Sequence, residues 1–304
     1  MVSPRRTALV TGATGYIGSH VVTRLLATGW RVRVLTRDAS GLGGQPWAGD
    51  VDVVEGDAQD ADVLARAADG VDVAWFLIHS MTGTFEYATR DRTIATRFGQ
   101  ACRAAGVARI VYLGGLYPDG ESLSPHLESR REVGHILLES GVPTAVLQAG
   151  IVVGAGSVSY ELLRTATERL PVVLGPDWLD HRVQPISIDD ALHYLVAVAD
   201  LPADVNREFD IGGADALPYR ELIRVYADVA GLRPRPILTV PVLLPRTTAL
   251  WAGILAPVPT SLASSLVASL MYDMVCREHD LDDLVAPPPG GPASFREAVV
   301  AARS

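Results

Sequence analysis

The sequence contains no lysine: all 26 of its Lys+Arg residues are arginines. Any role that needs a lysine amine is therefore excluded. Positive charge is also the scarcer sign, because 35 acidic residues leave a net charge of −9 at pH 7. A general nucleic-acid binder needs clustered basic residues to neutralise phosphates, so we expect no nucleic-acid partner. A local basic pocket for a small phosphate group remains compatible with this balance.

Cysteine is scarce too, with only Cys102 and Cys276. Neither has a short metal-ligand spacing, so we expect no metal site, and free thiols are typical of intracellular proteins. The amino-terminal residues lead directly into an apolar strand and lack the apolar stretch of a secretory signal. We therefore expect a cytoplasmic protein.

Long uninterrupted apolar stretches are missing. The most apolar region, residues 237–271, carries a single charge at Arg246, but four prolines interrupt it. A bilayer-spanning helix needs roughly 20 apolar residues, and none of that length fits between the prolines. We expect this region to pack against the rest of the protein, and membrane contact is the less favoured alternative.

Strand and helix patterns alternate through the first half of the chain. Apolar residues make up 48% of the sequence, enough for a sizeable core. The alternation predicts a doubly wound parallel sheet, the Rossmann fold, over residues 1–150. Residues 151–304 show a looser pattern and are predicted to form a smaller C-terminal α/β substrate lobe, partly interleaved with the sheet. The expected strands of the first half are 7–11, 31–36, 51–55, 71–78, 109–113 and 143–148, with helices at 15–28, 85–105 and 126–140.

A glycine-rich turn joins the first strand to the first helix. In it, Gly12 permits the tight turn, Gly15 lets the backbone approach a pyrophosphate, and Gly18 lets the helix pack closely on the sheet. The helix start also offers free N–H groups and a partial positive charge. This context predicts a dinucleotide site. The predicted binding residues of the turn are Gly12, Thr14, Gly15, Tyr16, Ile17 and Gly18.

The end of the second strand bears on the choice of cofactor. NAD binders usually carry an acid there, whereas this chain has Thr36 followed by Arg37. A carboxylate would repel a ribose 2′-phosphate, and an arginine can bind it. We expect NADP(H) in preference to NAD(H); the alternative is that Arg37 only pairs with Asp38 on a solvated loop. After the third strand, Asp57 and Ala58 are placed to border the adenine.

Three further residues lie where predicted strands end. Ligands of such sheets bind outside the carboxyl ends of the strands. His79 leaves the fourth strand and is a candidate cofactor or substrate contact. Gly114 ends the fifth strand and is assigned to the cofactor. Tyr117 is the nearest phenol to the same edge and a candidate proton donor.

The glycine turn, Asp57 and the segment Tyr112–Gly115 resemble the short-chain dehydrogenase/reductase superfamily, in particular its atypical, NmrA-like or extended members. The segment Gln184–Asp190 resembles their later strand-to-helix connection. The resemblance implies a serine after the fifth strand and a Tyr-x-x-x-Lys pair on the next helix. In such proteins the tyrosine exchanges a proton with the substrate oxygen, and the lysine lowers the tyrosine pKa and holds the nicotinamide ribose.

The chain departs from that pattern. Gly114 and Gly115 stand in the serine region, and His126 and Arg130 have the tyrosine–lysine spacing. We therefore expect the usual Ser-Tyr-Lys triad to be absent. Either His126 donates the proton while Arg130 holds the ribose, or acid catalysis is dispensable, as in hydride addition to a conjugated alkene, imine or quinone. The alternative for both residues is a solvated helix start.

These features predict an NADPH-dependent reductase acting on a small, rather apolar carbonyl, enone, imine or quinone. Two alternatives stay open. One is a non-catalytic NADP(H)-binding sensor or assembly protein of NmrA-like type. The other is a redox-neutral isomerase or cyclase on the same scaffold. The expected partner is a small-molecule substrate, and the sequence leaves the oligomeric state open, a homo-oligomer included.

Overall fold

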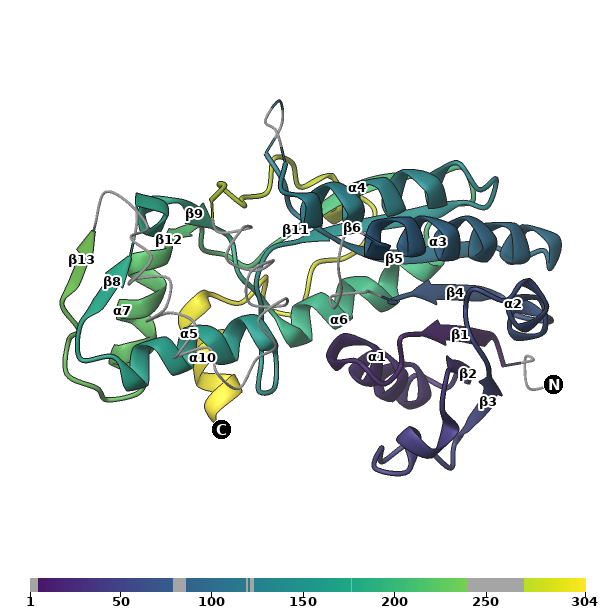
Figure 1. The fold of residues 1–304 in the computed structure, drawn as a ribbon, viewed down its shortest axis with the longest axis horizontal. Coiled ribbons are helices and arrows are strands. Elements are labelled where there is room, and N and C mark those ends of the chain that lie inside the picture. Colours follow the sequence, from purple (N-terminus) through teal and green to yellow (C-terminus); the bar gives the residue numbers. More distant parts are fainter. Residues whose placement is uncertain (1–4, 79–85, 119, 121–122, 176, 240–270) are drawn as a thin grey trace.

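The computed structural model describes residues 5–78, 86–118, 120, 123–175, 177–239 and 271–304. A seven-stranded sheet lies at its centre (Figure 1). Its strands are β1 (Thr7–Thr11), β2 (Arg31–Thr36), β3 (Val51–Glu55), β4 (Val73–Phe76), β5 (Arg109–Gly115), β6 (Thr144–Ala149) and β11 (Arg207–Ile211). Their order is β11-β6-β5-β4-β1-β2-β3, and every neighbouring pair is parallel. The strand order reverses between β1 and β4, so the predicted doubly wound Rossmann sheet is confirmed.

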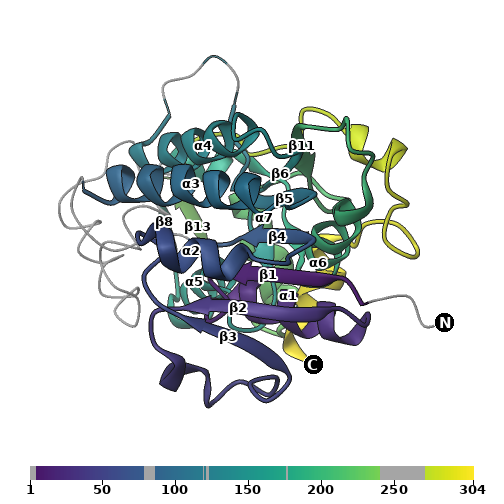
Figure 2. The same ribbon diagram turned by 90° about the vertical axis from the view of Figure 1, so that its right-hand side faces the viewer.

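Helices cover both faces of the sheet (Figure 2). One face carries α1 (Tyr16–Ala27) and α6 (Ile188–Ala197), and the other carries α2 (Ala61–Ala68), α3 (Glu86–Ala104) and α4 (Pro125–Leu138). Consecutive strand residues divide between two apolar clusters. Val10 belongs to the cluster beneath α1 and α6, and its neighbour Leu9 belongs to the cluster beneath α2, α3 and α4. The strands are therefore apolar on both sides, as buried parallel sheets require.

The second half of the chain contributes to both parts of the molecule. β11 pairs with β6, and α6 packs beside α1, so residues 188–211 complete the Rossmann sheet. The lobe on the left of Figure 1 has its own apolar cluster, which includes Tyr160, Tyr226 and Phe295. Leu281, in contrast, belongs to the cluster beneath α1 and α6. A boundary at residue 150 stays a prediction. The lobe helices are α5 (Val158–Arg169), α7 (Tyr219–Val229) and α10 (Phe295–Arg303), and its short strands are β7 (Val152–Val153), β8 (Val173–Gly175), β9 (Arg182–Val183), β10 (Ile186–Ser187), β12 (Leu217–Pro218) and β13 (Ile237–Thr239).

Two local features go beyond the predicted pattern. Residues 182–187 contain two short strands, β9 and β10, which pair with different partners, β12 and β7. Helix α2 was not predicted; it has only eight residues, and it begins where the Asp60 carboxylate accepts hydrogen bonds from the Asp62 and Val63 amides. Short 3-10 turns complete the structure at Ala39–Leu42, Asp177–Asp180, Val198–Asp200 and Asp280–Asp283.

Within the described residues no helix has the length and apolarity needed to cross a bilayer. The apolar region 237–271 was predicted to pack against the protein. Most of it lies outside the described residues.

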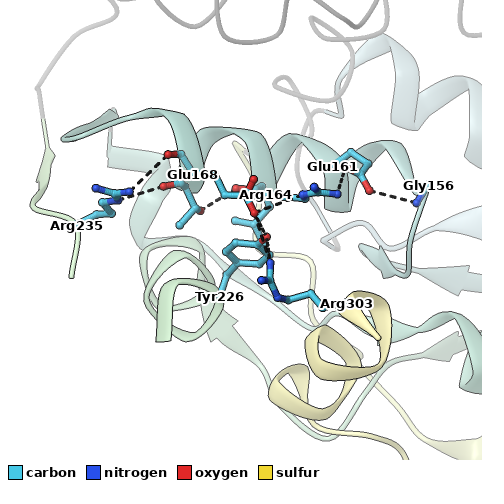
Figure 3. A network of polar contacts seen from close by, with 9 residues as sticks. Gly156, Glu161, Arg164, Glu168, Tyr226, Arg235 and Arg303 are labelled. Carbon is cyan, nitrogen blue, oxygen red and sulfur yellow. Dashed lines mark hydrogen bonds and ion pairs between the residues drawn. The ribbon is translucent and has the colours of Figure 1, made fainter. Parts of the chain in front are cut away.

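A polar network joins the three helices of the lobe (Figure 3). Glu168 on α5 accepts a hydrogen bond of 2.6 Å from the Tyr226 hydroxyl on α7. Arg303 on α10 lies 3.4 Å from the same carboxylate and donates to the Tyr226 hydroxyl at 2.8 Å. Arg164, one turn earlier on α5, approaches Glu168 at 3.4 Å. Because α10 lies near the carboxyl end of the chain, this network ties that end to the centre of the lobe.

The charge of Glu168 should contribute to stability. Partial burial acts to raise the pKa of its carboxyl, but hydrogen bonds and the nearby arginine charges outweigh burial and lower the pKa below 4.5. A carboxyl whose folded pKa is lowered stabilises the protein above its unfolded pKa, and this contribution disappears as the pH falls through the folded value. We expect Glu168→Gln to cost about 1 kcal/mol near neutral pH. Thermal unfolding over a pH series should show the difference from wild type shrinking below pH 4.5.

A matched control is Glu221→Gln, which breaks an exposed pair with Arg224 one turn along α7. Exposed pairs contribute on the order of 0.5 kcal/mol or less, so this variant should unfold almost as wild type does. Equal losses for the two variants, or a loss at Glu168 that does not change with pH, would show that the network does not stabilise the lobe through this charge.

Candidate cofactor and substrate site

The conformation of the turn after β1 requires glycine at two positions, because a Cβ at either would collide with the backbone. Gly12 has φ +70°, and a Cβ at this residue would collide with the carbonyl oxygen of Leu77, just after β4. A Cβ at Gly18 would collide with the Gly12 carbonyl. The Gly15 amide donates to that same carbonyl at 2.9 Å, which closes the turn. Any larger residue at 12 or 18 would push α1 away from the sheet.

The first turn of α1 is open to an anion. Gly15 is its N-cap and supplies no side-chain acceptor, and the first turn carries no acidic residue. Thr14 and Gly15 are exposed. By contrast, the start of α4 is capped by the Ser124 hydroxyl, which accepts from the Leu127 amide. Uncapped amides at the positive end of a helix favour phosphate, so the donors present fit a pyrophosphate.

Tyr16 and Ile17 position this turn through packing. Ile17 is half-buried against the cluster beneath α1 and α6. The Tyr16 ring lies against the loop after β7, where a Cβ at Gly156 would be 3.6 Å from it. The Tyr16 hydroxyl is buried without a hydrogen-bond partner in the described part of the chain. Burial, together with the charges of Asp189 and Glu161, raises its pKa to about 12.

The Arg37 guanidinium, just after β2, is not paired with any described residue. The Asp38 carboxylate accepts hydrogen bonds from the Ser40 amide at 2.8 Å and from the Ser40 hydroxyl at 2.6 Å. Asp38 therefore does not form the alternative ion pair with Arg37. Across the described ranges Arg37 has no ion pair or hydrogen bond, and it is exposed. Thr36 uses its hydroxyl on the Asp38 carbonyl at 3.1 Å. The guanidinium is therefore available to a ligand beside β2.

The end of β3 is more constrained. Asp57 accepts from the Gln59 amide at 2.8 Å and lies 3.6 Å from Arg90 on α3. Its side chain is still 45% exposed, so it can accept one more hydrogen bond. Ala58 is buried beneath it. Their contact with an adenine stays a prediction. The remaining predicted strand-end contact, His79, lies outside the described residues.

Gly114, near the end of β5, is paired in register with Gln148 of β6. A Cβ at Gly114 would collide with the Gln148 side-chain oxygen and would lie 3.1 Å from its Cδ. Gln148 is 1% exposed, and its amide makes no hydrogen bond within the described ranges. This residue was not among the predicted site residues. A polar residue at the carboxyl end of an apolar strand, the signal that selected His79, is also present at Gln148, but its position opposite Gly114 is defined only by the strand pairing.

His126 and Arg130 lie on the first turns of α4, beside the end of β5. Arg130 donates to the Leu113 carbonyl, and its Nε would be 3.5 Å from a Cβ at Gly115. The Tyr112 hydroxyl donates to the Arg130 carbonyl at 3.2 Å, which fixes this part of α4 to β5. His126 is 9% exposed, so it is not a solvated surface residue. Burial, reinforced by the Arg130 charge, lowers the pKa of His126 to about 4.

Tyr117 is held in a different set of contacts. Its hydroxyl donates to the Glu208 carboxylate of β11 at 2.7 Å, and the Arg277 guanidinium lies 4.7 Å from its ring centre. Burial, followed by the Glu208 hydrogen bond, raises the pKa of Tyr117 to about 12. A phenol with this partner and this pKa is a weak proton donor at neutral pH. Its assignment as a substitute acid stays a prediction that these contacts do not favour.

The site thus has two chemical parts. At one end of the sheet edge, backbone amides and an unpaired guanidinium are suited to phosphate groups. At the other, Arg130 contacts the Leu113 carbonyl of β5, and the buried Gln148 amide lies opposite Gly114. His126, whose pKa is lowered to about 4, lies one turn before Arg130 on α4.

Known proteins match both the sequence and the fold. The NAD(P)H-binding family matches residues 12–166, about half of the chain. A ceramide reductase from Caulobacter vibrioides is 31% identical over 270 residues, which cover 86% of this chain and 80% of the relative.

Among solved structures, an NADPH-dependent quinone oxidoreductase from Escherichia coli, in complex with NADPH, superposes with a TM-score of 0.76 at 19% identity, covering 98% of this chain and 100% of the other. Triphenylmethane reductase from a Citrobacter species, in complex with NADP(H), gives 0.73 at 19% identity, covering 98% and 99%.

The matched range begins at Gly12, inside the phosphate turn, and continues past α4. It therefore includes the turn, the strand ends and the helix with His126 and Arg130. The predicted fold and the predicted nicotinamide dinucleotide are both confirmed. The chain belongs to the NAD(P)H-binding family, among the atypical short-chain dehydrogenase/reductases that its sequence resembles.

Proposed function

We propose that this protein is an NADPH-dependent reductase of a small, rather apolar acceptor. The observation that carries the proposal is the placement of His126 and Arg130. They lie four residues apart on α4, and Arg130 donates to the end of β5. The short-chain dehydrogenase/reductase pattern that the sequence resembles has its tyrosine–lysine pair at this spacing on the same helix. The names of the similar proteins, a ceramide reductase and a quinone oxidoreductase among them, support reduction as the reaction class.

The phosphate turn supports binding of the cofactor through Gly12, Gly15 and Gly18, with Arg37 as the partner of the ribose 2′-phosphate. Bound NADPH supplies a hydride. Arg130 uses one N–H group on the Leu113 carbonyl, and its remaining donors are suited to the nicotinamide ribose or to a substrate oxygen. The lobe built from α5, α7 and α10 would enclose the acceptor against this edge.

The protonation state of His126 determines which classes of substrate the proposed reductase can reduce. With a pKa of about 4, roughly one imidazole in a thousand is protonated at pH 7. His126 therefore donates a hydrogen bond from a neutral ring, and water supplies the proton that completes the reduction. Such a site best serves an acceptor whose reduced form is a stabilised anion. Quinones and enones meet this condition better than simple ketones, so we place conjugated acceptors first.

The second candidate is a protein that binds NADPH without chemistry, and the absence of lysine favours it. A panel of quinones, enones, imines and carbonyl compounds distinguishes the two. We expect the near-ultraviolet absorbance of NADPH to fall with at least one conjugated acceptor. Binding of NADPH by calorimetry, with unchanged absorbance across the panel, would favour the sensor. Conversion of an acceptor without loss of NADPH would favour an isomerase or cyclase.

Arg37 should select NADPH over NADH. Charge-assisted hydrogen bonds contribute about 1.5–3 kcal/mol, so Arg37→Ala should raise the NADPH Kd roughly tenfold to a hundredfold and change the NADH Kd little. Arg24→Ala is a matched control, because Arg24 is also exposed but lies in the last turn of α1, away from the phosphate turn. Calorimetric titration of wild type and of both variants, with each cofactor, measures these affinities. Equal losses for the two cofactors would remove Arg37 from the 2′-phosphate.

The neutral His126 gives two observable consequences. A protonated donor would make kcat/KM fall as the pH rises through its pKa; because burial lowers the His126 pKa to about 4, we expect no such step near 6.5. Removing the donor with His126→Phe should lower kcat about a hundredfold, whereas His126→Gln, which keeps an N–H, should lose less. NADPH affinity should change little in both variants. A step near pH 6.5 that disappears in His126→Gln would instead identify an imidazolium donor.

A further inference from the structure

We propose that the Gln148 amide takes the place of the serine side chain that the fifth strand lacks, and donates a hydrogen bond to the reacting oxygen of the acceptor. The inference rests on the proposed reductase function and adds a residue to it. It assigns a role to a side chain on β6, the neighbour of β5, where the serine would be expected.

The first support is shape. A Cβ at Gly114 would collide with the Gln148 oxygen, and it would lie 3.1 Å from Cδ and 3.4 Å from Nε2 of the same side chain. All three heavy atoms of the amide head therefore surround the space that a residue-114 side chain would enter. A serine at 114 would therefore force the Gln148 amide out of its present position, so the amide occupies the space that a serine side chain would use.

The second support is the unmet hydrogen-bonding capacity of the amide. Gln148 is 1% exposed, and no hydrogen bond joins its amide to another described residue. A buried amide in this position favours a hydrogen-bonding partner. The other buried glutamine, Gln184, is satisfied: it donates to the Gly213 carbonyl at 2.8 Å and accepts from the Cys276 amide at 3.0 Å. Gln184 thus joins the loop after β11 to the segment at Cys276, whereas the donors of Gln148 are available to a ligand.

The third support is the face of the sheet. Side chains alternate along a strand, and Val146 and Tyr112 both belong to the cluster beneath α2, α3 and α4. Gln148 and Gly114, two residues further along each strand, therefore face the same side, the side of His126 and Arg130. An uncharged amide on the same face of the sheet as a neutral imidazole adds a donor that does not titrate near neutral pH. Such donors stabilise the negative charge that develops on a reduced oxygen.

The test exchanges the two groups. With NADPH and menadione, Gln148→Leu keeps the volume but removes the donors, and it should lower kcat about tenfold to a hundredfold. Its NADPH Kd should stay within about twofold of wild type, which a general disruption of the sheet edge would not allow. Gly114→Ser alone should unfold at a lower temperature, because its Cβ meets the glutamine.

The double variant Gly114→Ser/Gln148→Ala gives the decisive comparison, because Gln148→Ala alone removes the donors and leaves a gap. If the amide replaces a serine, a hydroxyl at 114 should restore both melting temperature and part of kcat relative to Gln148→Ala. A wild-type protein that does not oxidise NADPH with menadione or any panel acceptor would overturn the reductase function itself. An active wild type with an equally active Gln148→Leu variant would overturn only the role of Gln148.

Discussion

The close approach of the Gly12 carbonyl to the start of α1 determines where everything else in the site lies. Two contacts meet at this turn: the Gly12 backbone lies against the Leu77 carbonyl, and Gly18 lies against the Gly12 carbonyl. Together they fix the first helix against β1 and β4, the two strands between which the sheet order reverses. Because the amides of α1 then point at that switch point, the proposed pyrophosphate position follows from backbone geometry alone. The side chains at the other strand ends are arranged around it.

Local patterns predicted the parts of the fold that are themselves local. The strands from β1 to β6 and the glycine turn depend on alternation, on β-branched residues and on glycine, which neighbouring residues display. The return of β11 to the edge of β6 depends on contacts between residues more than 50 positions apart, such as Phe209 and Leu147. No periodicity in residues 151–304 distinguishes a strand that joins the main sheet from one that pairs within the lobe.

The same limit explains which site residues could be predicted. Arg37 and the turn follow from their distance along the chain to the first glycines. His126 and Arg130 could be placed because a helical spacing of four residues brings both to one face. Gln148 could not, since its importance comes from its register opposite Gly114, which only the pairing of β5 with β6 defines. The partner of Tyr117, Glu208, likewise comes from a strand at the far edge of the sheet.

The chemistry at the end of β5 depends on the absence of lysine as well as on the groups that are present. Without lysine, no amine can lower the pKa of a phenol at this edge, and Tyr117 has a pKa raised to about 12. The low pKa of His126 has the same physical origin, a buried site that disfavours a second positive charge beside Arg130. A site of this kind stabilises an anion better than it delivers a proton. The proposed conjugated acceptors, which hold negative charge in their reduced form, suit such a site, and the neutral Gln148 amide is a donor that it can bury.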